Sequence, residues 1–178
     1  MKETLEILLS RDQIAGRVGE LAEQISADYR TKRLVLVCIL KGAVIFLSDL
    51  MRMMPLPVEI DFMAVSSYGQ STSSSGVVRI LKDLDRNIGG KDVLVVEDII
   101  DTGLTLNYLY KNILQRRPRS LKVVTLLDKP ERRQVSFKPD YFGFSIPDHF
   151  VVGYGLDFNE RYRHLPDICI LKGLPGAR

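Results

Sequence analysis

Three acidic residues gather within a short segment that follows an apolar run, Val93 to Val96. Glu97 and Asp98 come directly after this run, and Asp101 follows three positions later. Carboxylates this close repel one another and are costly to desolvate, so a cation or a group rich in hydroxyls should meet them. Carboxylates accept hydrogen bonds from a sugar diol and also attract Mg²⁺. The segment therefore predicts a site for a diol, for Mg²⁺, or for both.

The five residues Asp101 to Thr105, Asp-Thr-Gly-Leu-Thr, predict an anion site. They stand where a strand is expected to give way to a helix, and free backbone N–H groups and the helix dipole favour an anion there. Gly103 allows close backbone approach, and the two threonine hydroxyls add donors. A phosphate monoester would fit, and together with the diol site it describes a ribose 5-phosphate. The GxxxxGK[ST] pattern of a Walker A loop is absent from the sequence.

Helix capping is the alternative interpretation of these acids, with Asp101 or Thr102 as the N-cap residue. Capping accounts for one acid near the start of a helix. It does not account for Glu97 and Asp98 directly after four apolar residues, so the pattern favours the ligand site.

Apolar runs and helical periodicities alternate along the chain. Ser10 and Gln13 fit a capping box, and apolar residues then recur at helical spacing. We expect helices over residues 10–29, 43–54 and 104–115, and strands over residues 34–40, 58–66, 77–81, 93–96, 121–127, 141–144, 150–153 and 168–171.

This alternation predicts a single α/β domain, residues 1–178, around a mostly parallel sheet flanked by helices. In such folds ligands bind outside the carboxyl ends of the strands. The rule brings together three segments of the sequence: Leu40 to Gly42, Glu97 to Thr105, and Asp128 with Lys129.

Composition is that of a soluble globular protein, with 46% hydrophobic residues and a net charge of +3, too small to indicate nucleic acid. Cys38 and Cys169 lie in apolar runs and are expected to be buried free thiols, which suits a reducing cytosol. A disulfide is less favoured, and zinc still less, because no cysteine pair has ligand spacing. The charged N-terminus does not fit a signal peptide, and no apolar run could span a membrane. We expect a cytoplasmic protein.

The segment VVEDIIDTGLT resembles the phosphoribosyl pyrophosphate (PRPP) binding motif of type I phosphoribosyltransferases. The resemblance is greatest to the hypoxanthine-guanine phosphoribosyltransferases and runs from about Ile7 to Ile170. It implies the type I fold, with a small hood and a mobile lid loop. Four further motifs follow the family order: LKGA at residues 40–43, SSYG at 66–69, LLDKP at 126–130 and FVVGYGLDFNE at 150–160.

The resemblance implies an enzyme of purine salvage that uses Mg²⁺. It would transfer phosphoribosyl from PRPP to N9 of hypoxanthine or guanine, forming IMP or GMP and releasing pyrophosphate. The family forms dimers and tetramers, so a homodimer or homotetramer is expected. Two alternatives are a regulator that senses PRPP or nucleotides, and a phosphoribosyltransferase acting on adenine, xanthine or a pyrimidine.

On the ribose side, the resemblance implies that Glu97 and Asp98 hold the 2- and 3-hydroxyls and contribute to a magnesium site. Asp101 would act as general base at purine N7, or stabilise the proton leaving it, which needs a partly desolvated carboxylate. The 5-phosphate would lie against Asp101, Thr102, Gly103, Leu104 and Thr105.

On the purine side, Lys129 would donate to the 6-oxo group, Phe150 would stack on the base, and the backbone of Val151 would contact its edge. A cation at the 6-position rejects adenine, whose amino group is itself a donor. Without the resemblance, Phe150 and Val151 would be interpreted as core.

Pyrophosphate, by the same resemblance, would meet Arg163 and the backbone of Lys41 and Gly42, and Asp157 would position a second Mg²⁺ through water. Many relatives have a cis peptide before the lysine. Ser67 and Tyr68 would begin the lid, within a serine- and glycine-rich stretch that favours a mobile loop. Closing it would exclude water from a reactive ribosyl centre.

Two other groups of residues have simpler interpretations. The run Glu131 to Arg133 is expected to be a charged surface turn or part of a subunit contact. His149 and His164 are expected to be surface or interface residues and not metal ligands.

Overall fold

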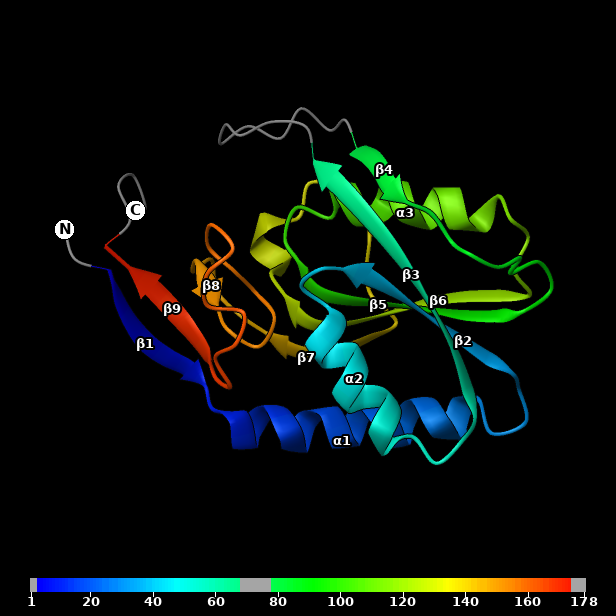
Figure 1. The fold of residues 1–178 in the computed structure, drawn as a ribbon, viewed down its shortest axis with the longest axis horizontal. Coiled ribbons are helices and arrows are strands. Elements are labelled where there is room, and N and C mark those ends of the chain that lie inside the picture. The colour runs from blue at the N-terminus through cyan, green and yellow to red at the C-terminus, as the bar shows by residue number, and fades with distance from the viewer. Residues whose placement is uncertain (1–2, 68–77, 174–178) are drawn as a thin grey trace.

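A six-stranded sheet forms the centre of the computed structural model, which describes residues 3–67 and 78–173 (Figure 1). The strand order is β4-β3-β2-β5-β6-β7. Only β4 is antiparallel to its neighbour, which confirms the mostly parallel sheet. The strands are β2 (Leu34–Leu40), β3 (Val58–Ser67), β4 (Val78–Lys82), β5 (Asp92–Ile100), β6 (Ser120–Asp128) and β7 (Tyr141–Ser145).

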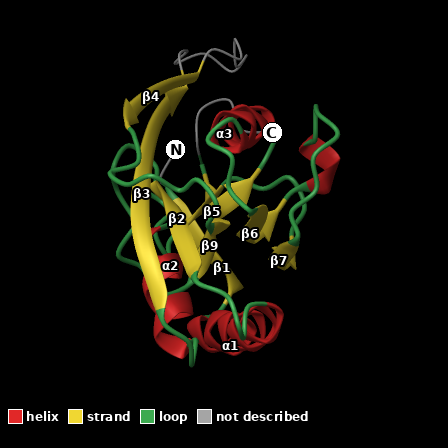
Figure 2. Cartoon of the chain, turned by 90° about the vertical axis from the view of Figure 1, so that its right-hand side faces the viewer, coloured by secondary structure: helices red, strands yellow, loops and turns green. Residues whose placement is uncertain are grey.

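Helices cover both faces of this sheet: α1 (Arg11–Asp28) and α2 (Val44–Met53) on one side, and α3 (Leu104–Leu114) on the other (Figure 2). Successive residues of a strand point to opposite faces. Leu36 and Cys38 of β2 accordingly join the cluster around α1 and α2, whereas Val35 and Val37 join the cluster around α3. Both faces of β2 are therefore buried, as its uninterrupted apolar run predicts.

The start of α1 follows from its capping box. The Gln13 backbone N–H donates to Ser10 Oγ at 3.3 Å, and the Ser10 backbone N–H donates to Gln13 Oε1 at 2.9 Å. The buried stripe of the helix contains Ile14, Val18 and Leu21, all at most 1% exposed. The capping box and the helical spacing predicted from the sequence are both confirmed.

A small antiparallel sheet, in the order β1-β9-β8, lies beside the main sheet (Figure 1). Its strands are β1 (Thr4–Leu9), β8 (Val151–Val152) and β9 (Ile168–Lys172). It corresponds to the hood that the family resemblance implies. Leu9, Val151 and Ile168 belong to the same buried cluster as α1 and α2, so the two sheets share one core.

Strand β5 is longer than the sequence analysis predicted. It was expected to end at Val96, but it continues through Glu97 and Asp98 to Ile100. Ile99 and Ile100 pair with β6, whereas the pairing of β5 with β2 ends at Val96. The extension is possible because the two acids satisfy neighbouring backbone N–H groups and the two isoleucines keep the ladder to β6.

Other predicted elements agree with the structure to within one or two residues, and two elements were not predicted. These are β1 and a 3-10 turn, η1 (Pro130–Arg132). Cys38 and Cys169 are free and buried, as expected. Among the helices in the described ranges, none combines the length and apolar character needed to cross a bilayer.

Candidate active site

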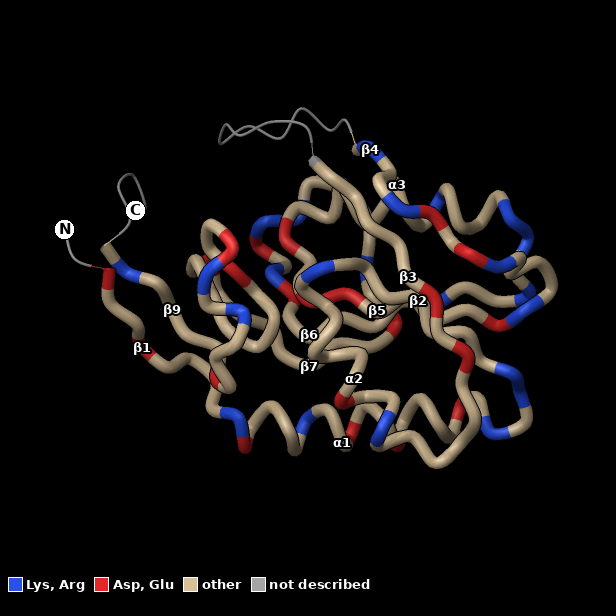
Figure 3. The backbone as a smooth tube through the Cα atoms, viewed as in Figure 1, with Lys and Arg blue, Asp and Glu red and all other residues tan. Residues whose placement is uncertain are grey.

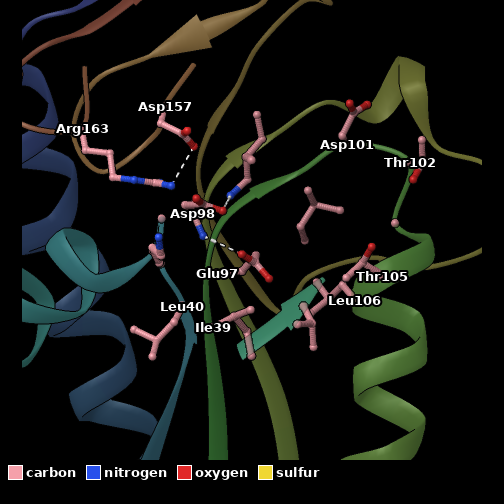
Figure 4. A pocket seen from close by; sticks show the side chains of 16 residues that line it. Ile39, Leu40, Glu97, Asp98, Asp101, Thr102, Thr105, Leu106, Asp157 and Arg163 are labelled. Atoms are coloured by element: carbon pink, nitrogen blue, oxygen red, sulfur yellow. Dashed lines mark hydrogen bonds and ion pairs between the residues drawn. The ribbon is translucent and has the colours of Figure 1, made fainter. Parts of the chain in front are cut away.

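A cavity of about 320 Å³ opens at the carboxyl ends of β2 and β5 (Figure 4). Figure 3 shows acidic and basic positions gathered in this region, between the main sheet and the small sheet. Most of the predicted site residues line the cavity, although they come from three separate segments of the chain. They are Lys41, Gly42, Glu97, Asp98, Asp101, Thr102, Gly103, Thr105, Asp157 and Arg163.

Glu97 and Asp98 form the acidic centre of the cavity. Burial, with a contribution from the neighbouring Asp98 carboxylate, raises the pKa of Glu97 well above its usual value, and burial also raises the pKa of Asp98. Within residues 3–67 and 78–173, neither carboxylate has an ion-pair partner within 4.0 Å. Their hydrogen bonds run from the Asp98 N–H to Glu97 Oε1 and from the Ile99 N–H to Asp98 Oδ1, at 3.2 and 2.7 Å. The pair can therefore accept a diol or a divalent cation.

A metal cage made of protein side chains alone is not present in the part of the chain that the structure describes. No three His, Cys, Asp or Glu residues gather there closely enough to hold an ion. Mg²⁺ commonly keeps several waters and is bound through one or two carboxylates plus substrate phosphates. The acidic pair fits that mode of binding.

The loop after β5 turns at Gly103, which has a φ of +80° and is the N-cap residue of α3. No side chain caps the helix, so the alternative that Asp101 or Thr102 is its N-cap is wrong. Thr102 Oγ1 accepts only a long hydrogen bond, 3.4 Å, from the Leu104 N–H. The first-turn N–H groups of a helix have no helical acceptor, so this loop can bind an anion. The Leu104 side chain does not line the cavity.

Two glycines allow the loop after β2 to approach the acidic pair. A Cβ atom on Gly42 would lie 1.6 Å from Asp98 Oδ2. A Cβ on Gly155, whose φ is +100°, would lie 2.1 Å from the Gly42 carbonyl oxygen. The peptide bond between Leu40 and Lys41 is cis. Gly155 was not among the predicted site residues, and the Gly-Tyr-Gly pattern in its motif was the only available signal.

Arg163 and Asp157 reach the cavity from the segment that follows β8 (Figure 4). They form an ion pair with 2.9 Å between Arg163 Nη2 and Asp157 Oδ1. Arg163 Nη1 also donates to the Gly155 carbonyl at 2.8 Å. Glu160 lies between two cations, 3.2 Å from Lys41 Nζ and 3.4 Å from Arg163 Nη2. Arg163 and the loop of Lys41 and Gly42, which were predicted to meet pyrophosphate, thus lie on one side of the cavity.

A second cavity, of about 610 Å³, is lined by two of the three residues predicted to meet a purine. Lys129 lines it with only 8% of its side chain exposed, and its Nζ donates to the His149 carbonyl at 2.6 Å and to Asp148 at 3.4 Å. Phe150 lines it with 44% of its surface exposed. Val151 is buried in β8 and does not line the cavity. Asp101 lines both cavities and therefore joins them.

The predicted base, Asp101, is more exposed than its role suggested. Its side chain is 43% exposed and pairs with Arg132, with 3.0 Å between Nε and Oδ1. Arg133 donates to the Asp101 carbonyl at 2.7 Å and pairs with Asp128. Residues 130–132 form the turn η1 and the Glu131 and Arg132 side chains are exposed, so the expected charged surface turn is present. The contacts of Arg132 and Arg133 with Asp101 were not predicted, because Asp101 is distant from them in the sequence.

The predicted lid residues are described only in part. Ser67 is the last residue of β3 and pairs with Val78 in β4. Tyr68 lies outside the described residues.

Comparisons with known proteins agree with this geometry. The family model "Phosphoribosyl transferase domain" matches residues 5–159. The hypoxanthine-guanine phosphoribosyltransferase of Mycobacterium tuberculosis is 57% identical over 171 residues, which cover 93% of this chain and 85% of that protein. The enzyme of the same name from Bacillus subtilis is 49% identical over 173 residues, covering 97% and 96%. A crystal structure of a hypoxanthine phosphoribosyltransferase from Staphylococcus aureus superposes with a TM-score of 0.91 at 49% identity, covering 94% of this chain and 91% of that one. The chain therefore belongs to the phosphoribosyltransferase family and, within it, to the hypoxanthine-guanine phosphoribosyltransferases.

Proposed function

We propose that this protein transfers the phosphoribosyl group of PRPP to N9 of hypoxanthine or guanine, with formation of IMP or GMP and release of pyrophosphate. The reaction belongs to purine salvage. The observation that carries the proposal is the position of Asp101, which lies where an anion-binding cavity meets a cavity holding a buried lysine. A phosphoribosyl donor and a purine placed in these cavities would meet at that residue.

The ribose 5-phosphate has a binding site in the first cavity. Residues 101–105 offer backbone N–H groups at the start of α3, the hydroxyls of Thr102 and Thr105, and the close approach that Gly103 permits. Glu97 and Asp98 accept the two ribose hydroxyls, which supply the donors that this carboxylate pair lacks.

The purine is selected in the second cavity. The Lys129 ammonium has three donors, of which two are used by His149 and Asp148. The third remains for the 6-oxo group of hypoxanthine or guanine. Adenine presents an amino donor at that position, which would leave a buried charge without an acceptor. Phe150 is exposed enough to stack on the base, and Val151, whose side chain is buried in β8, would contact the base edge through its backbone alone.

Asp101 is the catalytic residue in this proposal. As N9 bonds to the ribose C1 atom and the C1–pyrophosphate bond breaks, the purine N7 proton passes to the Asp101 carboxylate. Arg132 pairs with Oδ1, and Oδ2, which has no ion-pair or hydrogen-bond partner among residues 3–67 and 78–173, would accept that proton. A positioned carboxylate of this kind contributes roughly 10²- to 10⁴-fold to rate.

Pyrophosphate leaves from the side of the cavity that carries Arg163 and the backbone of Lys41 and Gly42. Bound Mg²⁺ would neutralise charge on this leaving group. Glu97 and Asp98 would hold one ion, and Asp157 would orient a second through water. Closure of a lid that begins at Ser67 and Tyr68 would keep water from the ribosyl centre.

The proposal also covers organisation and location. The protein forms a single domain, is cytoplasmic, and assembles as a homodimer or homotetramer. The shared core of the two sheets supports one domain over residues 1–178, and the two free cysteines suit a reducing compartment. Helix α2 exposes Val44, Ile45 and Met53, which would be covered in an assembly. Light scattering on the purified protein would give the number of subunits.

Nucleotide formation from PRPP and Mg²⁺ tests the activity, with hypoxanthine, guanine, xanthine, adenine and uracil supplied separately. We expect IMP and GMP, with adenine and uracil unreactive. If PRPP binds but no base reacts, the alternative of a PRPP- or nucleotide-sensing regulator becomes the better account.

A further inference from the structure

Four charged side chains, Asp101, Arg132, Asp148 and Lys129, follow one another along the wall of the larger cavity, and we refer to them as the charge belt. Arg132 Nε lies 3.0 Å from Asp101 Oδ1, and Arg132 Nη1 lies 3.5 Å from Asp148 Oδ2. Lys129 Nζ lies 3.4 Å from Asp148 Oδ1. Acids and bases alternate, so Arg132 and Asp148 link the proposed base to the proposed purine lysine.

The backbone around the belt is tied together in the same place. The Lys129 N–H donates to the Ile100 carbonyl at 2.9 Å, and the Gln134 N–H donates to the Thr102 carbonyl at 2.9 Å. The Arg133 guanidinium donates to the Asp101 carbonyl. The turn that carries Lys129 and Arg132 is therefore joined to the loop that carries Asp101 at three points, before the ion pairs are considered.

The separation of Asp101 and Lys129 matters because they would contact adjacent groups of one purine. O6 is an acceptor and N7–H a donor, and these two groups lie side by side on the ring system. A donor and an acceptor on the protein must be held at a matching separation, since reactive geometry tolerates little displacement.

We propose that Arg132 and Asp148 are positioning residues that fix Asp101 and Lys129 at the separation required to read O6 and N7–H of a 6-oxopurine. The inference rests on the proposed function. Arg132 uses two different nitrogens on two different carboxylates, which the branched guanidinium permits. A lysine offers a single nitrogen and could keep the charge but not both contacts.

Stabilisation of the fold is a poor explanation for the belt. The side chains of Asp101, Arg132 and Asp148 are 43, 46 and 49% exposed, and ion pairs at such sites contribute little to stability. Their geometry should therefore affect the binding and reaction of the purine more than it affects unfolding.

Steady-state kinetics of Arg132→Gln, Arg132→Lys and Asp148→Asn test the inference, with hypoxanthine and PRPP varied in turn and the melting temperature measured for each variant. For hypoxanthine, we expect kcat/KM to fall by roughly tenfold in all three. The KM for PRPP and the melting temperature should stay close to those of the wild type. Arg86→Gln is the matched control, because Arg86 is an exposed arginine that also pairs with an acid, Glu59 at 3.9 Å, and lines none of the cavities described above.

Three results would overturn the inference. The first is a kcat/KM for hypoxanthine within twofold of the wild type in Arg132→Gln or Asp148→Asn. The second is a rise in the KM for PRPP of the same size as the fall in kcat/KM for hypoxanthine, which would indicate general damage to the site. The third is full recovery in Arg132→Lys, which would show that charge alone suffices. If the wild-type protein is inactive, the proposed function itself is rejected. If the Arg132 variants do not fold, the kinetics of Asp148→Asn test the inference.

Discussion

The two ends of strand β5 carry acids in opposite situations. At its start, the Asp92 side chain is 2% exposed and accepts hydrogen bonds from Arg119 Nε at 3.0 Å and Ser120 Oγ at 2.6 Å. Burial alone would raise the pKa of Asp92, but these bonds outweigh it and the pKa is lowered. At the other end, burial raises the pKa of both Glu97 and Asp98.

The difference separates a structural acid from a functional one. Asp92 has its counter-charge in the fold and gains nothing from a ligand. Glu97 and Asp98 lack a close cation among the described residues, so a bound diol would supply hydrogen-bond donors to them, or a bound cation would supply the counter-charge. Asp101, just beyond the strand, is intermediate, because Arg132 pairs with Oδ1 while Oδ2 has no partner within the described part of the chain.

The largest effect is expected for Asp101→Asn. If the functional end of β5 carries the chemistry, turnover should fall by about 10²- to 10⁴-fold because an amide cannot take the N7 proton. PRPP binding, measured by calorimetry, and the melting temperature should change little. Unchanged turnover would remove Asp101 from the role of base.

Asp92→Asn is expected to have the reverse profile. The amide cannot replace the charge-assisted bonds from Arg119 and Ser120, so the free energy of unfolding should fall by about 2 kcal/mol. Urea unfolding measures this, and turnover of the folded enzyme should be unaffected.

The pH dependence of the free energy of unfolding, compared between Asp92→Asn and the wild type, is the control for a loss of packing. Because the folded-state pKa of Asp92 is lowered, its contribution is present above the unfolded value, near 3.8, and is lost as pH falls through the folded value. The variant and the wild type should therefore converge in strong acid. A difference in stability that persists there would mean that packing, and not the ion pair, was removed.

Gly42→Ala tests whether PRPP binding depends on the position of the Asp98 carboxylate at the carboxyl end of β5. The added Cβ would lie 1.6 Å from Asp98 Oδ2, so the carboxylate must move away from its present position. We expect the KM for PRPP to rise by about tenfold, with a small change in melting temperature. Gly16→Ala in α1 is the control, because nothing lies within 4 Å of its added Cβ. Equal KM values in the two variants would show that the Asp98 position does not matter for PRPP.

Sequence reasoning succeeded where a pattern is local. The apolar run Leu34–Leu40 predicts a strand buried on both faces, and Ser10 with Gln13 predicts the start of α1. The strand-end rule gathered the loops after β2 and β5 at one cavity. Each of these predictions depends on residues a few positions apart or on a general property of parallel sheets.

It failed where the decisive partner is distant in sequence. The contact between Arg132 and Asp101 was not predicted, because the two residues lie 31 positions apart in the sequence. β1 was not predicted because its side chains are mostly exposed and its only partner, β9, is at the other end of the chain. The length of β5 was underestimated because Glu97 and Asp98, two charged residues inside the strand, were interpreted as marking its end.

The smallest effect is expected for Glu97→Gln, and it should be a gain in stability. Below the unfolded pKa, near 4.5, Glu97 is protonated in both states and the substitution should change little. As pH rises, the unfolded chain loses the proton first and the folded chain keeps it to a higher pH, because burial raises the folded pKa. The free energy of unfolding of the wild type therefore decreases as pH rises. The glutamine variant does not show this decrease, because its amide does not titrate.

At neutral pH the melting temperature of Glu97→Gln should exceed that of the wild type by roughly 2–4 °C, a gain absent at pH 4. PRPP and Mg²⁺ should reverse the order, because they supply the missing positive charge and donors only where the carboxylate is present. Scanning calorimetry at both pH values, with and without ligands, separates the effects. A variant less stable than the wild type at neutral pH without ligand would mean that Glu97 has a structural partner, and the contrast between the two ends of β5 would fail.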